Sequence, residues 1–301
     1  MTGATAATAS ATNLRAIIAM VLSQAVFTVN DAAMKLAAQK LPGGEAIFIR
    51  GLFTIVFARA LALALGGFRT WPPAADWPRI ALRNVGEIGA TLLFLTALFH
   101  MPIAETTAIL QVLPLAITAG AALFLGEPVG WRRWLATGVG FIGVLIIIRP
   151  GTSAFNPWSL VALASVACIV LRDLTTRRID PAVPTVLLTF LSSLTVTVAA
   201  SGLALVETWI WPDPRTVALI GAAALFLLGG YYFVIEAMRH GEVAVVSPFR
   251  YSVIVWAIAA GLLVFDEQPD PVAIAGTAVV MAAGLYTFFR ERQLRHERRG
   301  P

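Results

Sequence analysis

Long apolar runs are the feature that most restricts how this chain can fold. Ten of them follow one another along the 301 residues, separated by short connections that contain Pro, Gly or charged residues. A helix that spans a bilayer needs about 20 predominantly apolar residues. The runs begin near Leu14, Glu45, Ile80, Ile103, Trp131, Trp158, Pro184, Val217, Val243 and Val272. We therefore predict an all-α polytopic membrane protein with ten transmembrane helices.

The composition agrees with lipid as the main solvent of this chain. It is 58% hydrophobic and 13% charged, whereas soluble domains carry about 25% charged residues. The net charge of +5 comes from basic residues between the apolar runs and in the tail, without the interleaved aromatics of a nucleic-acid surface. A single cysteine, Cys168, allows neither an intrachain disulfide nor a thiolate metal cluster. We expect no cofactor, no metal, no nucleic-acid partner and no enzymatic activity.

Charge asymmetry between the connections predicts the orientation. Most Lys and Arg residues outside the spans fall on the side that also holds both termini, and this side is expected to be cytoplasmic. The protein is thus predicted to lie in a bacterial inner membrane, as a monomer or weak homodimer. Residues 1–13 are small and uncharged and predict a disordered tip, while residues 291–301 form a basic cytoplasmic tail.

Two halves of the chain resemble each other. The stretch "ALFHMPIAETTAI" from Ala97 aligns with "AMRHGEVAVVSPF" from Ala237 at a constant offset of 140 residues. The halves, residues 14–150 and 157–290, hold five predicted spans each. Because five is odd, the second half would enter the membrane inverted relative to the first. Inverted repeats are typical of alternating-access transporters, whose substrate site lies near the midplane between the halves.

The stretches "ALFHMPIAETTAILQVLPLAITAGAALFLGEP" and "SPFRYSVIVWAIAAGLLVFDEQPD" resemble the two halves of EamA-type drug/metabolite transporters. The resemblance runs from the first span to Tyr286, and departs from the family at Asp266, where a Gly-Glu pair is usual. It implies two inverted five-helix repeats around a central cavity. The first, third and fourth helices of each half would line that cavity, and the fifth would pack peripherally.

Polar side chains inside apolar runs are the candidates for substrate binding, because such groups are costly in lipid and usually face a cavity or another helix. Interhelical hydrogen bonding is the alternative for the two glutamines, and core packing the alternative for the tryptophan. Pro114 is predicted to kink the fourth span. The candidates are Gln24, Glu87, Gln111, Tyr231, Tyr251 and Trp256.

Three charged residues nearer to span ends are candidate gates, namely Arg83, Glu105 and Arg250. Arg83 lies four residues before Glu87, so an ion pair on one helix face is the alternative for it. In the first span, the same spacing predicts that Asp31 pairs locally with Lys35.

These observations predict a secondary transporter that moves small polar metabolites across a lipid bilayer by alternating access. An amino-acid exporter fits best, because amides, tyrosines, a tryptophan and few charges suit a zwitterion. An importer of a larger metabolite, such as a nucleoside, a vitamin or an S-adenosylmethionine-like compound, is the alternative. A non-transporting membrane subunit is the alternative from another class. Phosphorylated substrates are disfavoured because they would require paired cations on the cavity face.

Overall fold

The computed structural model describes residues 4–64, 71–126, 129–240 and 243–299. Within these ranges every regular element is a helix, which confirms the predicted fold class. Ten helical segments are long and apolar enough to cross a membrane, and the predicted starts at Ile103, Trp131 and Trp158 coincide with observed ones. The segments are Thr12–Ala38, Gly43–Ala64, Ala74–His100, Ile103–Leu125, Trp131–Ile148, Trp158–Thr176, Thr185–Ala204, Pro214–Met238, Ser247–Val264 and Pro271–Arg290.

Eight of these segments are built on one long α-helix each. In chain order they are α1 (Ala4–Ala38), α2 (Gly43–Ala64), α3 (Trp77–His100), α6 (Trp131–Ile148), α7 (Trp158–Thr176), α8 (Thr185–Ala204), α9 (Pro214–His240) and α12 (Pro271–Arg299). A short 3-10 helix, η1 (Ala74–Asp76), leads into α3.

Helix α1 begins at Ala4, inside the stretch that was expected to be a disordered tip. Five of its first eight residues are alanine, the residue with the highest intrinsic helix propensity, so the helix of the first span continues back into this stretch. Residues 1–3 of the expected tip lie outside the described residues.

The fourth and ninth spans are interrupted. The fourth consists of α4 (Ile103–Leu110) and α5 (Leu113–Leu125), and Pro114 lies at the start of α5, as the predicted kink requires. The ninth consists of α10 (Val243–Val246), the 3-10 helix η2 (Ser247–Ser252) and α11 (Val253–Val264). Helices α10 and α11 begin 140 residues after α4 and α5, which is the offset found between the two halves of the sequence.

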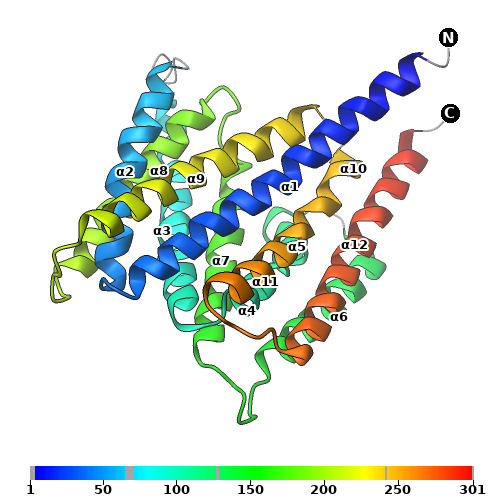
Figure 1. Ribbon diagram of the computed structural model, residues 1–301. Coiled ribbons are helices and arrows are strands. Elements are labelled where there is room, and N and C mark those ends of the chain that lie inside the picture. Colours follow the sequence, from blue (N-terminus) through cyan, green and yellow to red (C-terminus); the bar gives the residue numbers. More distant parts are fainter. Residues whose placement is uncertain (1–3, 65–70, 127–128, 241–242, 300–301) are drawn as a thin grey trace.

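The pairing of helices follows the same division of the chain. The most extensive contacts join α1 to α9, α3 to α7, α2 to α8 and α6 to α12 (Figure 1). The first span of each half (α1 and α7) pairs with the third span of the other half (α9 and α3). The second spans, α2 and α8, pair with each other, and so do the fifth spans, α6 and α12. Both termini lie at the same end of the molecule in Figure 1. These relations support the predicted repeat.

Glycines allow α6 and α12 to approach backbone to backbone. A Cβ added at Gly143 would lie 2.9 Å from the carbonyl oxygen of Gly276, and one added at Gly276 would lie 2.7 Å from that of Gly143. Small residues at such crossings allow close packing of membrane helices. In contrast, Gly138 on α6 has no neighbouring atom within 4 Å of an added Cβ.

We therefore expect Gly143→Leu to destabilise the protein by about 1–3 kcal/mol, because the larger side chain forces α6 and α12 apart. The matched change Gly138→Leu should leave stability nearly unchanged. Thermal unfolding of the purified variants in detergent measures both effects. Equal losses in the two variants would contradict close packing at Gly143 as the cause.

Candidate functional site

A cavity of about 310 Å³ lies among α2, α3, α7, α8 and α9. Its volume is near the lower end of the range of about 300–1,000 Å³ that is typical of small-molecule sites. Hydroxyl groups and charged groups make up much of the lining. The charged residues are Arg50, Arg83, Glu87, Arg172 and Asp173, and the hydroxyl-bearing ones include Thr54, Thr91, Thr176, Thr185, Thr189, Ser192, Ser193 and Tyr231.

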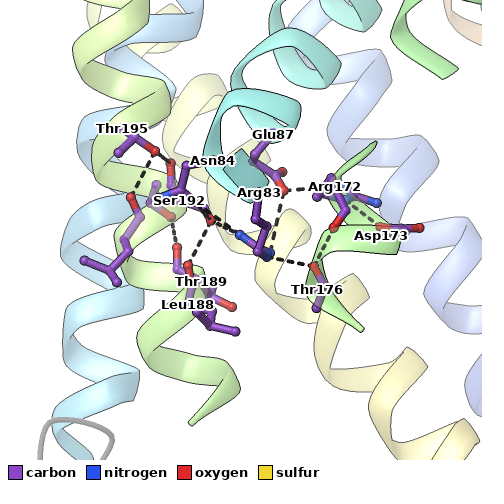
Figure 2. A network of polar contacts seen from close by, with 12 residues as sticks. Arg83, Asn84, Glu87, Arg172, Asp173, Thr176, Leu188, Thr189, Ser192 and Thr195 are labelled. Carbon is purple, nitrogen blue, oxygen red and sulfur yellow. Dashed lines mark hydrogen bonds and ion pairs between the residues drawn. The ribbon is translucent and has the colours of Figure 1, made fainter. Parts of the chain in front are cut away.

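Glu87 lies between two guanidinium groups that come from different helices (Figure 2). Its Oε2 atom is 3.7 Å from Nη2 of Arg83 on the same helix and 3.5 Å from Nη1 of Arg172 on α7. Arg172 also donates from Nε to the carboxylate of Asp173 at 2.7 Å. The predicted Arg83–Glu87 pair is thus present, but it belongs to a larger charge network that joins α3 to α7.

Arg83 also joins three helices through neutral partners. It donates from Nε to the hydroxyl of Thr176 on α7 at 3.1 Å, and from Nη1 to the hydroxyl of Ser192 on α8. The same Ser192 hydroxyl donates to the side-chain carbonyl of Asn84 at 3.0 Å. These contacts fix the position of the Arg83 guanidinium in the wall of the cavity (Figure 2).

Arg50 differs from the other two arginines of the cavity. Its side chain is buried, and no hydrogen bond or ion pair within the described part of the chain engages its guanidinium. It interacts at longer range with the charges of Asp31 and Glu87. With three arginines against two carboxylates in its lining, the cavity is richer in charge than the few charges expected from the sequence. That expectation was wrong, because nearly uniform apolarity does not reveal which face of a helix points inward.

Two of the candidate substrate-binding residues line this cavity, namely Glu87 and Tyr231. The ring of Tyr231 packs edge-on against Phe27, with ring centroids 5.3 Å apart. Arg83, a predicted gate, lines the cavity as well.

The two candidate glutamines are buried away from the cavity lining. Gln24 donates from Nε2 to the sulfur of Met20 at 3.6 Å, and Gln111 donates from Nε2 to the carbonyl oxygen of Thr107 at 2.9 Å. Each partner lies four residues earlier in the same span. Each amide therefore donates a hydrogen bond within its own span. Neither the predicted position in the cavity nor the alternative of a hydrogen bond between helices is observed within the ranges that the structure describes.

The two aromatic candidates of the ninth span also lie outside the cavity lining. Tyr251 is buried against α12, where a Cβ added at Gly284 would collide with its hydroxyl group. Trp256 on α11 is 37% exposed. Both positions follow from the interrupted span, in which a 3-10 segment changes the phase of the residues around Tyr251.

In the described part of the chain, the other two candidate gates form no hydrogen bond or ion pair with the charge network. Glu105 lines a smaller, largely apolar pocket of about 140 Å³ between α4, α11 and α12. Arg250 lies exposed in η2, where its charge interacts with that of Asp173.

An ion pair between Lys35 and Glu267 closes one end of the helix bundle. Lys35 Nζ contacts Glu267 Oε1 and the carbonyl oxygen of Met101, both at 2.5 Å. The second carboxylate oxygen of Glu267 accepts a hydrogen bond from the backbone N–H of Ile103 at 2.9 Å. The predicted local pair with Asp31 was therefore wrong, since Lys35 connects α1 to residues 232 positions away in sequence.

Further polar contacts stabilise the same end. Arg149, which follows α6, forms an ion pair with Asp270, which precedes α12. The carboxylate of Glu207 accepts hydrogen bonds from the first turn of α2, at Gly44 and Glu45. We call the Lys35–Glu267, Arg149–Asp270 and Glu207 contacts the closed end.

The cavity extends away from the closed end. Helix α7 starts at the closed end after Arg149, and its last residue, Thr176, lines the cavity together with Thr185, the first residue of α8. Arg50 lies seven residues into α2, about 10 Å from the start of that helix at the closed end. Arg50 therefore lines the part of the cavity nearer to the closed end, one turn beyond Ile47 on the same helix.

Ten bilayer-length helical segments, with a charged cavity among five of the helices and polar contacts that close one end, agree with the architecture of a membrane transporter. Residues 14–149 and 156–289 both match the EamA-like transporter family, and the chain belongs to this family. It is a multi-pass bacterial membrane protein.

The chain is similar over nearly its whole length to curated bacterial transporters. It is 24% identical to the S-adenosylmethionine uptake transporter of Rickettsia prowazekii, over 94% of this chain and 95% of the relative. It is 29% identical to the riboflavin transporter of Rhizobium johnstonii, over 93% and 92%. It is 25% identical to the pseudopaline exporter CntI of Pseudomonas aeruginosa, over 89% and 93%. A crystal structure at 18% identity aligns with a TM-score of 0.58 over 93% of this chain and 97% of the other, which indicates the same fold.

Proposed function

We propose that this protein is a secondary transporter of a bacterial inner membrane that carries small polar metabolites by alternating access. The cavity bordered by Arg50, Glu87 and Arg172 is proposed as the substrate site, and amino acids are the first candidate substrates. The observation that carries this proposal is a charged cavity between the two halves of the chain that extends away from the closed end to the last residue of α7 and the first residue of α8.

The proposed orientation places the end of the cavity near Thr176 and Thr185 toward the cytoplasm. The closed end contains the C-terminal end of α1, so the other end of the cavity lies on the side of the termini (Figure 1). That side carries most of the Lys and Arg residues outside the spans, which favours the cytoplasm. The structure would then be the inward-facing state, from which an exporter loads its substrate.

Import of a larger metabolite is the second candidate function. Two of the relatives, named as an S-adenosylmethionine uptake transporter and a riboflavin transporter, favour a larger metabolite, and the name of the first favours uptake. The interactions within the cavity do not depend on the direction of net movement. One flux experiment therefore tests the candidate substrates of both functions.

The experiment is counterflow into liposomes that contain the purified protein. Each amino acid, S-adenosylmethionine and riboflavin is tested as a labelled compound against itself, with and without a pH gradient. Saturable flux of an amino acid above protein-free liposomes is the expected result. Flux of S-adenosylmethionine or riboflavin alone would replace the amino-acid assignment, and no flux of any compound by folded protein would favour a non-transporting subunit.

A further inference from the structure

Arg50 is the one charged residue of the described cavity lining whose side chain has no hydrogen-bond or ion-pair partner. Arg50 is 8% exposed, lines the cavity, and its guanidinium has no hydrogen-bond or ion-pair partner among the described residues. A guanidinium presents five N–H donors. None of the Arg50 nitrogens is a fully buried atom without a partner, so these donors face the cavity and are available to an acceptor that enters it.

The other two cavity arginines already have their acceptors. Arg172 is shared between Glu87 and Asp173, and Arg83 between Glu87 and the hydroxyls of Thr176 and Ser192. Their charges and much of their hydrogen-bonding capacity are thus used within the protein. A ligand that enters the cavity meets one guanidinium without a hydrogen-bond or ion-pair partner among the described residues, that of Arg50.

Asp31 on α1 is an acidic neighbour of Arg50 that leaves the guanidinium unpaired. Asp31 on α1 interacts electrostatically with Arg50 without forming an ion pair, and its carboxylate accepts a hydrogen bond from the Asn30 side chain at 2.8 Å. In its ionised form, Asp31 lowers the electrostatic cost of the buried cation. It does not occupy the donors of the guanidinium, which stay available to a ligand.

A single available guanidinium indicates which chemical group of a ligand would bind here. Arginine binds a carboxylate through two parallel hydrogen bonds, so a single guanidinium satisfies a single carboxylate in charge and in geometry. A phosphate dianion would leave a second charge without a free cation. We propose that the transported compound carries a carboxylate and that Arg50 binds it in the cavity, an inference that rests on the proposed transport function.

The test compares carboxylates with their neutral carboxamides in the liposome assay. For the amino acid with the highest flux, the matching amino-acid amide should compete at least about tenfold more weakly in the wild-type protein. Arg50→Gln should raise the KM for the carboxylate about 10- to 100-fold, because it removes hydrogen bonds to a charged group. Competition by the carboxamide should change little, and Arg50→Lys should retain part of the affinity.

Arg59→Gln is the matched control, because Arg59 lies exposed on the same helix and outside the cavity lining. It should leave both KM values unchanged. If Arg50→Gln does not fold because Asp31 loses its neighbouring cation, the double variant Asp31→Asn/Arg50→Gln removes both charges, and the same increase in KM is expected in it.

The outcomes separate this inference from the proposed function. An unchanged KM in Arg50→Gln, or equal competition by acid and amide, overturns the carboxylate assignment while transport stands. Flux of riboflavin, which has no carboxylate, without flux of any carboxylate compound also overturns it. Absence of all flux from folded wild-type protein overturns the transport function itself.

Discussion

Glu87→Gln is expected to destabilise the protein by about 3 kcal/mol and to reduce transport at least about tenfold. The change removes the carboxylate that lies between the guanidinium groups of Arg83 and Arg172 and leaves two nearby cations with less compensation. Breaking a buried ion pair by removing one partner costs about 3–5 kcal/mol. The lower value applies because these side chains border the cavity, with 13–23% of their surface exposed.

A double-mutant cycle tests the cause of this loss. Arg172→Gln in combination with Glu87→Gln removes one charge of each sign, so the double variant should be more stable than the sum of the two single losses predicts. Thermal unfolding in detergent gives the stabilities, and counterflow gives the transport rates. Strictly additive losses would show that Glu87 and Arg172 do not interact in the folded protein.

Lys35→Ala is expected to open the closed end of the bundle. It removes the contacts of Lys35 with Glu267 and with the Met101 carbonyl, and leaves the Glu267 carboxylate with the hydrogen bond that the Ile103 N–H donates to it. The cost of about 3–5 kcal/mol for breaking such a buried pair corresponds to a shift of about 100-fold or more in the equilibrium between closed and open ends.

Thiol labelling measures this opening. Ala37 is fully buried at the closed end, so Ala37→Cys, made in a Cys168→Ala background, should react slowly with a membrane-impermeant thiol reagent. Adding Lys35→Ala should accelerate the reaction about 100-fold. Lys40→Ala is the control, because its ion pair with Asp213 is 3.6 Å long and lies on the surface, where such pairs contribute little. Equal acceleration by both changes would contradict a specific role of the Lys35–Glu267 pair.

The helices of this fold were predictable because each apolar run is long and the breaks between runs contain Pro, Gly and charges. The interruption at Pro114 and the spacing of Arg83 and Glu87 were likewise visible as local patterns. Such features depend on residues within a few positions of one another, and the sequence displays them directly.

The cavity was less predictable, because it depends on the rotation of each helix about its axis. In a helix that is apolar on nearly all faces, the sequence does not show whether the side chain of Arg50 or Arg172 points to the lipid headgroups, to a neighbouring helix or to a cavity. The Lys35–Glu267 pair joins residues 232 positions apart, so no local spacing indicates it. Gln24 and Gln111 were attractive candidates as buried amides, but a sequence does not show that a carbonyl or sulfur one turn earlier binds them.

Substrate protection of a cysteine in the cavity tests the proposed site most directly. Thr91 on α3 lies one turn beyond Glu87 and lines the cavity, so Thr91→Cys in the Cys168→Ala background should react with a small thiol reagent. The compound found to move in counterflow is predicted to slow this labelling at concentrations near its KM, while a carboxamide analogue is predicted to have little effect. If the transported compound leaves the labelling rate unchanged although flux persists, the substrate does not pass through this cavity.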